Sequence, residues 1–469
     1  MSGTVSFLIG AGFSAPFGIP TMGPFYSDFI TEVKSRYPSL LPAVDRAIDK
    51  IETSPDLESL LSVLNTASEV ESGLPDDFIN EEIHKWVSDA EALRSHLLSY
   101  IIERCESFDR AMAAKVCLPL MQGLANSEIL IFSTNYDRVI EHACRLAGVE
   151  LSDGFERGAD QTPRPWQADF DGGLVLAKLH GSVTWYVDRS KREAYWRLDR
   201  GYALPGPEFQ LSRDGSTLRP LMIIPTLEKD VLGDPYSHLA HLFSARLSRT
   251  TLLVVMGSSL RDEHLISAIR YYADDLVVLV IGKGADEAAN RLEGNRTFTL
   301  EASAEVFLDH STRQLLQLVE KASEDYSFEE LSTLVEEFAG EQRRMLSEID
   351  DLDEEERRYL SALRSEVPSA VLPALSRLRG KANQILIDAT ISLLDSPEEV
   401  IRSTAAGNLG TVASTEALEP LRRLALDDPM PLVRIEAGLA LHEIGTPEAR
   451  AALEEYQERQ PDDRLNQLL

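Results

Sequence analysis

Short apolar runs that alternate with helical patterns constrain the fold of this 469-residue chain more than any other feature. Each run is rich in Leu or β-branched residues, as buried strands are, and helical patterns such as Tyr236–Leu247 lie between several of them. Alternating strands and helices form a largely parallel sheet that is covered on both faces. We therefore predict an α/β fold with a Rossmann-like, mostly parallel sheet. The predicted strands are Val5–Ile9, Glu128–Ser133, Leu174–Leu179, Leu221–Ile224, Thr251–Met256, Leu276–Ile281 and Thr297–Leu300.

The chain is long enough for more than one domain. Residues 1–322 are predicted to form the α/β domain, with a large helical insertion at about residues 25–126. Residues 323–365 read as an acidic helical linker, and residues 366–469 as an all-α domain. Residues 182–220 are polar and aromatic, and the sequence leaves open whether they form a hairpin or a lid.

An internal repeat with an offset of 32 residues occupies the last part of the chain. Val400–Arg402 corresponds to Leu432–Arg434, and Leu409 corresponds to Leu441. Each unit contains an Ala-rich helix, a turn and a second helix, and it resembles the HEAT repeat of α-solenoids. Such a unit cannot bury its apolar face without a neighbour. The repeats are expected either to bind a partner protein or to pack against the first domain.

Charge and cysteine content exclude several classes of function. A net charge of −31 argues against a broad nucleic-acid-binding surface, which needs Lys and Arg to neutralise phosphates. The three cysteines, Cys105, Cys117 and Cys144, lack the spacing of a disulfide framework or a zinc site, so no metal is expected. No apolar run approaches the ~18 residues of a membrane span. We expect a cytoplasmic protein.

Glycine-rich or polar segments follow four of the predicted strands. They are Gly10–Ser14, Thr134–Asp137, Lys178–Ser182 and Gly257–Leu260. Because the carboxyl ends of parallel strands meet at one edge of a sheet, where ligands bind, we expect these segments to lie together. Glycine turns of this kind let a phosphate approach the backbone near a helix N-terminus.

Each of these segments also has a purely structural interpretation. Asn135 or Asp137 would cap the helix that follows the second strand, since both residue types are good N-caps. A histidine such as His180 is more often structural than catalytic when it stands alone. The hydroxyl of Ser258 would cap the helix that begins near Asp262. The sequence does not separate these roles from ligand binding.

Taken together and in this order, the four segments resemble the sirtuin family, and more closely its bacterial sirtuin-like NAD hydrolase branch. That branch typically shows G-A-G-x-S, T-N-Y-D, K-L-H-G-S and then G-x-S-L-x-D-x-H, which stands here at residues 257–264. The resemblance covers about residues 3–320. It implies an NAD+ hydrolase that cleaves the nicotinamide–ribose bond to give nicotinamide and ADP-ribose.

The resemblance also implies roles for individual residues. Asn135 would hold the nicotinamide-side ribose and the attacking water, and His180 would act as a general base at the ribose hydroxyls. Asp137 would contact the amide of nicotinamide, the first glycine turn would meet the diphosphate and ribose, and the last segment would lie by the adenosine. The residues expected to bind NAD, which is the substrate, are Gly10, Ala11, Gly12, Ser14, Thr134, Asp137, Gly257 and Ser258.

Two departures from deacylating sirtuins favour hydrolysis. The four-cysteine zinc site of those enzymes is missing, and their Gly-Ile-Pro-x-Phe-Arg loop appears here as Gly18–Met22 without the Arg. The resemblance implies a regulated, NAD-depleting effector of bacterial antiphage defence that acts by abortive infection. It further implies a homo-oligomer or a protein partner that uses the C-terminal helices. A zinc-free NAD-dependent deacylase and a non-catalytic NAD or ADP-ribose sensor are the alternatives.

Overall fold

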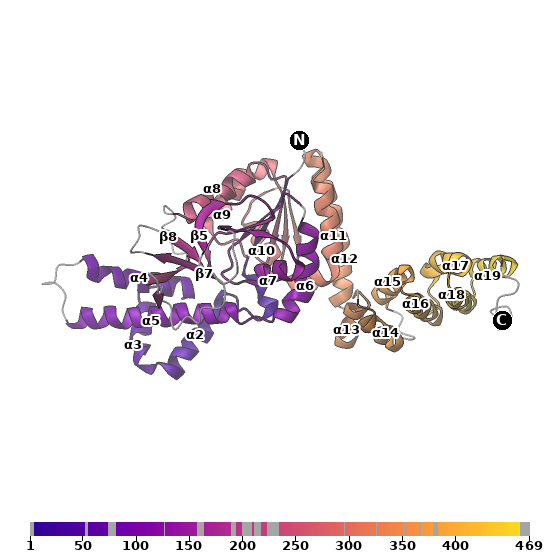
Figure 1. The fold of residues 1–469 in the computed structure, drawn as a ribbon, viewed down its shortest axis with the longest axis horizontal. Helices are drawn as coiled ribbons and strands as arrows, with labels where there is room; N and C mark the ends of the chain where they lie inside the picture. The colour runs from indigo at the N-terminus through magenta and orange to yellow at the C-terminus, as the bar shows by residue number, and fades with distance from the viewer. Residues whose placement is uncertain are drawn as a thin grey trace. The chain divides into compact units, whose positions relative to one another are not determined.

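The chain divides into two compact units, Met1–Gly340 and Glu341–Leu469. The first unit is α/β and the second is helical in the computed structural model (Figure 1). No helix in the part of the chain that the structure describes is long and apolar enough to cross a membrane. The structure describes residues 4–51, 55–73, 81–125, 127–156, 164–188, 194–198, 209–210, 217–222, 234–294, 296–324, 326–350, 352–364, 367–378 and 383–459.

A seven-stranded sheet forms the centre of the first unit, in the order β13-β12-β11-β1-β2-β6-β3 (Figure 1). All of its neighbouring strands pair in parallel, so the predicted Rossmann-like sheet is confirmed. The strands are β1 (Val5–Ile9), β2 (Leu130–Ser133), β3 (Leu151–Ser152), β6 (Leu174–Lys178), β11 (Leu252–Met256), β12 (Val277–Ile281) and β13 (Thr297–Leu300).

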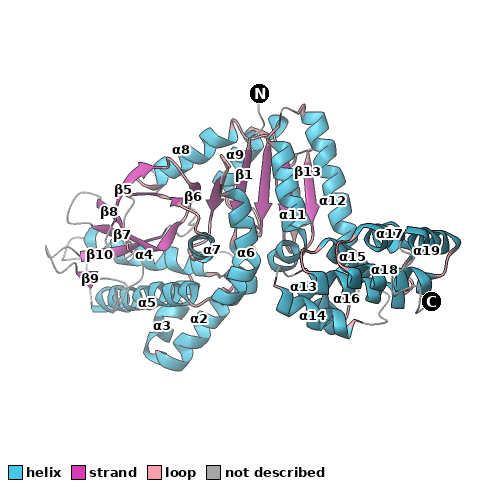
Figure 2. Ribbon diagram, turned by 45° about the vertical axis from the view of Figure 1, so that its right-hand side comes forward, coloured by secondary structure: helices cyan, strands magenta, loops and turns pink. Residues whose placement is uncertain are grey.

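Helices cover the sheet on both sides (Figure 2), which is why β1, β11 and β12 are buried along their whole length. Leu253 and Val255 of β11 join one apolar cluster with residues of α8 (Tyr236–Leu247), α9 (Glu263–Tyr271) and α10 (Ala285–Asn290). A separate group of helices packs together: α6 (Arg110–Leu124), α7 (Val139–Ala147) and α11 (Ala304–Ala322).

The described part of the predicted helical insertion is indeed helical. Its first four helices lie together in Figure 1, whereas α6 packs with α7 and α11. Phe78–Val87 and Ala90–Phe108 both carry apolar residues at helical spacing, and their described residues up to Glu106 lie on a single helix, α5. No Gly or Pro separates the two stretches, so nothing interrupts the helix. The four helices are α2 (Met22–Arg36), α3 (Leu41–Ile48), α4 (Leu57–Gly73) and α5 (Glu81–Glu106).

A second, antiparallel sheet stands in place of the undecided hairpin or lid. Its order is β4-β5-β8-β7-β10-β9, and aromatic residues of its strands pack against each other, such as Phe155 and Trp185 with ring centroids 5.0 Å apart. The predicted parallel strand Leu221–Ile224 was wrong: Leu221 and Met222 end β10, which pairs antiparallel with β7, and residues 223–224 lie outside the described residues. A short apolar run carries no information about which sheet it joins. The strands are β4 (Gly154–Phe155), β5 (Arg164–Asp169), β7 (Gly181–Asp188), β8 (Ala194–Arg197), β9 (Phe209–Gln210) and β10 (Thr217–Met222).

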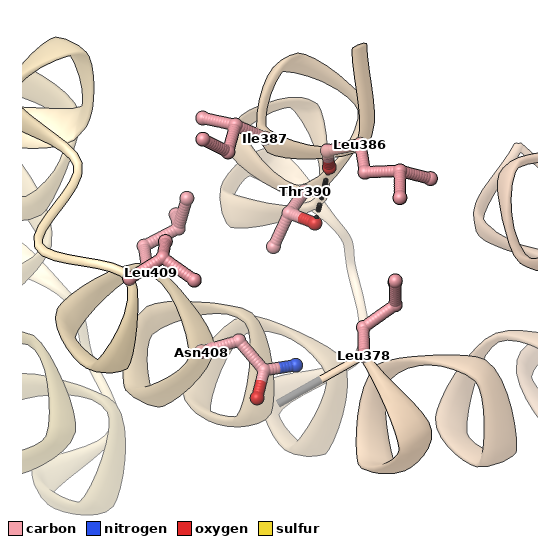
Figure 3. A pocket seen from close by; sticks show the side chains of 7 residues that line it. Leu378, Leu386, Ile387, Thr390, Asn408 and Leu409 are labelled. Carbon is pink, nitrogen blue, oxygen red and sulfur yellow. Dashed lines mark hydrogen bonds between the residues drawn. The ribbon is translucent and has the colours of Figure 1, made fainter. Parts of the chain in front are cut away.

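Paired helices make up the second unit. The first helices of the two sequence repeats are α16 and α18, and they pack against each other. Figure 3 shows Thr390 and Asn408 among the apolar residues that line a small cavity in this unit. Asn408 donates from Nδ2 to the carbonyl of Leu375 at 2.7 Å, so its buried amide is paired. The helices, including α12 at the division between the units, are α12 (Phe328–Asp350), α13 (Glu354–Leu363), α14 (Pro368–Arg377), α15 (Gln384–Ser392), α16 (Glu399–Thr411), α17 (Leu418–Asp427), α18 (Pro431–Ile444) and α19 (Pro447–Arg459).

Gly410 sets the distance between α16 and α18. A Cβ added at Gly410 would lie 2.6 Å from the Cα of Ala440, which is backbone and cannot move aside. Three residues earlier on the same helix, a Cβ at Gly407 would meet only the far end of the Glu436 side chain, at 3.2 Å. The two glycines therefore differ in the packing that they permit, although both are helical.

We predict opposite effects for the substitutions Gly410→Ala and Gly407→Ala. Gly410→Ala forces the two helices apart and is expected to destabilise the second unit by about 1–3 kcal/mol. Gly407→Ala is expected to stabilise it by up to ~1 kcal/mol, because alanine is the better helix former. Hydrogen exchange of α16 and α18 in the full chain measures the change in stability for each variant. Equal protection of these helices in the two variants would contradict the prediction.

Candidate functional site

The turns after β1 and β11 lie against each other, backbone to backbone. The N–H of Gly10 donates to the carbonyl of Met256 at 3.0 Å, and that of Gly12 donates to Gly257 at 2.7 Å. A Cβ at Gly10 would lie 2.6 Å from the Cα of Ser258. Gly257, with φ at +67°, has no room for a side chain beside Gly12. Close packing thus requires these glycines, and because their N–H groups are occupied, a phosphate would not receive hydrogen bonds from Gly10 or Gly12.

Asn135 links the end of β2 to the turn after β1. Its Nδ2 donates to the carbonyl of Gly10 and to the hydroxyl of Ser14, both at 3.0 Å, and the residue is 8% exposed. The N–H of Thr134 donates to the carbonyl of Ile9 at 2.9 Å, which extends the same link. Because a carbonyl can only accept, the orientation of the amide is determined. The oxygen Oδ1 is therefore the atom of this side chain that remains to accept a hydrogen bond.

Asp137 is buried at the start of α7. Its Oδ1 accepts from the N–H of Val139, the first residue of α7, at 3.0 Å, although Arg138 and not Asp137 occupies the N-cap position. Burial raises the pKa of the Asp137 carboxyl, and the opposing effects of Lys178, the Val139 N–H and the Ser14 hydroxyl do not cancel it. Ser14 thus connects Asn135, whose hydrogen bond it accepts, to Asp137, to which it donates.

A buried ion pair between Lys178 and Glu141 fixes the loop around Asp137 to the start of α7. Lys178, at the end of β6, donates from Nζ to the backbone carbonyl of Asp137 and forms an ion pair with Glu141 at 3.1 Å. The side chains of Lys178 and Glu141 are 3% and 6% exposed. Glu141 lies one turn into α7, so the lysine holds the loop and the helix together. Charges buried this deeply are tolerated only as a pair.

His180 lies where the chain leaves one sheet and enters the other. β6 ends at Lys178, and β7 of the antiparallel sheet begins at Gly181. Gly181 has φ at +85°, and a Cβ there would lie 2.6 Å from the carbonyl oxygen of Leu221, so the turn requires glycine. The predicted glycine turn after the strand is therefore present. Its function in the fold, the change of sheet, was not predicted.

The ring of His180 pairs with Asp262, which precedes α9. His180 Nε2 lies 2.9 Å from Asp262 Oδ2, and the other carboxylate oxygen accepts from the N–H of His264 at 3.0 Å. Asp262 was not among the predicted site residues, although it stands in the motif at residues 257–264. The sequence marks it only as a residue near the start of a predicted helix, and nothing in the sequence pairs it with His180.

The four predicted segments form a closed ring at one edge of the sheet. β11, β1, β2 and β6 are consecutive in the strand order, and backbone or side-chain hydrogen bonds join each neighbouring pair of strand ends. The contact between His180 and Asp262 joins the two outer strands, which are three strand spacings apart, about 14 Å. It closes the ring over the ends of β1 and β2, so all four segments that the sequence analysis singled out come together.

The three cysteines are not part of the four segments, and their thiols are not reactive. All three are free and buried. Burial raises the pKa of all three thiols, that of Cys144 to about 12, so they are protonated at neutral pH. Within the described ranges, no group of three or more His, Cys, Asp or Glu side chains is placed to hold a metal ion.

Two parts of the sequence match known family models. Residues 129–276 match a family described as a SIR2-like domain, and residues 387–468 match HEAT repeats. The first match includes three of the four site segments and implies an NAD-related activity. The segment Gly10–Ser14 lies outside it, and the tertiary structure brings this segment to the others.

Solved structures of sirtuins show a distant similarity to the chain. One is a mutant Sir2 homologue in complex with ADP-ribose, with 15% identity, a TM-score of 0.38, and coverage of 68% of this chain and 93% of that one. Another is a Sir2 protein bound to a propionylated peptide, with 15% identity, a TM-score of 0.33, and coverage of 67% and 93%. No curated protein sequence matches the chain.

We predict that Lys178→Met destabilises the first unit by about 3–5 kcal/mol, because it leaves the Glu141 carboxylate buried without a counter-charge. The double variant Lys178→Met/Glu141→Leu removes that charge and is expected to recover most of the loss. All four tryptophans lie in the first unit, so urea unfolding followed by tryptophan fluorescence reports on it. A double variant no more stable than the single one would show that the ion pair is not the cause.

Proposed function

We propose that the chain is an NAD+ hydrolase that cleaves the N-glycosyl bond between nicotinamide and ribose and releases nicotinamide and ADP-ribose. The observation that carries this proposal is that Asn135 and His180 follow the neighbouring parallel strands β2 and β6 at one edge of the sheet. Both residues are largely buried there, at 8% and 7% exposure. The SIR2-like match supports NAD as the substrate.

The reaction depends more on the positioning of water and ribose than on a strong general acid. Nicotinamide is cationic in NAD, so the electron pair of the breaking bond neutralises it as it leaves, and an oxocarbenium-like ribose remains. The oxygen of a water molecule then bonds to C1′, and the water loses one proton. Holding the water in line with C1′ supplies much of the rate enhancement. This sequence of steps needs no metal.

Asn135 and His180 have complementary roles in the proposed reaction. The amide oxygen Oδ1 of Asn135 accepts a hydrogen bond from the attacking water or from a hydroxyl of the nicotinamide-side ribose, since Nδ2 is already engaged. His180 accepts a proton as the general base, a role that typically contributes about 10²- to 10⁴-fold. The amide of Asn135 thus holds the water that attacks, and the imidazole of His180 accepts its proton.

The remaining site residues would bind the substrate. Asp137, whose pKa is raised by burial, would exchange hydrogen bonds with the carboxamide of nicotinamide. The turn around Ala11 and Ser14 would lie by the diphosphate and ribose. Gly257 and Ser258 would lie by the adenosine.

The helical repeats would regulate this activity. An enzyme that depletes NAD must stay silent until it is needed, and the resemblance to antiphage NAD hydrolases gives abortive infection as the setting. HEAT-type repeats present extended surfaces to partners. We propose that they bind an activating or inhibiting protein or a second copy of the chain.

Asn135→Ala and His180→Ala are each expected to abolish nicotinamide release from NAD. Exposed residues of the same types, in Asn290→Ala and His241→Ala, serve as controls that should leave it unchanged. The purified protein is incubated with NAD, alone and with extract of infected cells, and nicotinamide is followed by chromatography. Release that needs an acylated peptide would instead identify a deacylase. NAD binding without release would identify a sensor, and full turnover in either site variant would refute the assignment.

Removal of the residues after Asp350, which keeps α12 whole, is expected to change the rate of nicotinamide release. A higher rate means that the repeats restrain the enzyme, and a lower rate means that they assemble it. Light scattering of both chains shows whether the oligomeric state changes in parallel. An unchanged rate, with and without the infected-cell extract, would contradict a regulatory role.

A further inference from the structure

The pairing of His180 with Asp262 joins the outer strands of the site. It links residues 82 positions apart in the chain, and the two side chains are 9% and 12% exposed. A helix cap alone needs only one carboxylate oxygen, and Oδ1 serves it. The second oxygen, Oδ2, is directed at the imidazole.

We propose that Asp262 is a positioning residue that determines which nitrogen of His180 carries the proton and thereby prepares His180 as the base. This proposal rests on the proposed NAD+ hydrolysis. Asp262 acts on the reaction through His180 and does not need to touch the substrate. It extends the candidate site to a residue that the sequence analysis treated only as the start of a helix.

The chemistry of the pair determines the tautomer. A carboxylate only accepts hydrogen bonds, so the nitrogen that faces it, Nε2, carries the hydrogen. In a neutral imidazole the lone pair then lies on Nδ1, which becomes the nitrogen that accepts a proton in the reaction. When Nδ1 takes that proton, the adjacent carboxylate stabilises the imidazolium that forms. The same logic governs the His–Asp pair of serine proteases.

The backbone around Asp262 holds its carboxylate in place. Leu260 adopts the left-handed region, with φ at +47°, and its side chain is 2% exposed within the apolar core. Its N–H donates to the hydroxyl of Ser258 at 3.2 Å. A non-glycine residue in this conformation is held by its surroundings. Asp262 is thus fixed on both sides, by the anchored Leu260 and by the cap of α9.

The substitution Asp262→Asn separates the cap from the effect on His180. Asparagine caps a helix about as well as aspartate, so Oδ1 can still accept from His264. The amide then presents a donor to Nε2 instead of an acceptor. His180 must shift its hydrogen to Nδ1, which removes the lone pair that the base needs. The matched control is Asp109→Asn, since Asp109 caps α6 by accepting from Met112 at 2.9 Å.

Both variants are made in the full chain and assayed for nicotinamide release under the conditions in which the wild type is active. Asp262→Asn is expected to lower kcat by about 10²- to 10⁴-fold, with little change in KM for NAD, because general-base catalysis contributes that much. Asp109→Asn is expected to retain wild-type kcat. Urea unfolding followed by tryptophan fluorescence should give both variants similar midpoints, so that a loss of folding does not explain the result.

NMR of chain labelled with ¹⁵N-histidine reads the tautomer without any reaction, and His180→Ala assigns the signals. The expected result is a hydrogen on Nε2 of His180 in the wild type and on Nδ1 in Asp262→Asn. Wild-type kcat in Asp262→Asn, or an unchanged tautomer, would overturn the proposal. If the wild type releases no nicotinamide under any condition, the proposed function fails and the catalytic role of Asp262 with it, while the spectra still decide whether Asp262 sets the tautomer.

Discussion

The amide of Asn135 donates both of its hydrogens across the gap between β1 and β2, and the arrangement of the site depends on this. One hydrogen bond goes to the backbone of Gly10, which itself lies against the turn after β11. The other goes to Ser14, which in turn contacts Asp137. Movement of the amide would therefore disturb three strand ends at once. The same bonds leave the amide oxygen Oδ1 to accept a hydrogen bond.

Two aspartates each contact a helix N-terminus and also take part in the contacts of the site. Asp137 and Asp262 each use Oδ1 to accept from a backbone N–H at the start of the helix that follows, and each is also part of the contacts around the site. A helix N-terminus fixes the direction of a carboxylate far better than a loop does, because the N–H donor is rigid. A carboxylate has two oxygens, so one side chain can accept from a helix N–H and also contact another residue of the site. The two roles that the sequence offers for such a residue do not exclude each other.

The parallel sheet could be predicted because central strands such as β1, β11 and β12 are buried on both faces, and such strands read as continuous apolar runs. β1 matches its predicted bounds, and β2, β6, β11, β12 and β13 lie within or at theirs. The antiparallel sheet escaped prediction for the opposite reason. Its strands mix aromatic and polar residues, as in Gly181–Asp188, and the short apolar run at Leu221 does not indicate which sheet it joins.

The sequence by itself determined the fold class, the repeat at the carboxyl end, and the four segments that meet at the sheet edge, because strand order along the chain and residue type suffice for these. Tertiary structure alone decided which atoms of those segments meet. It paired His180 with Asp262, which the local sequence marks only as a residue near the start of a helix. It also showed that Gly10 and Gly257 are needed for close packing of two turns, whereas the sequence suggested that they leave room for a ligand. Such pairings depend on distances between strand ends, and no local pattern encodes a distance across three strands.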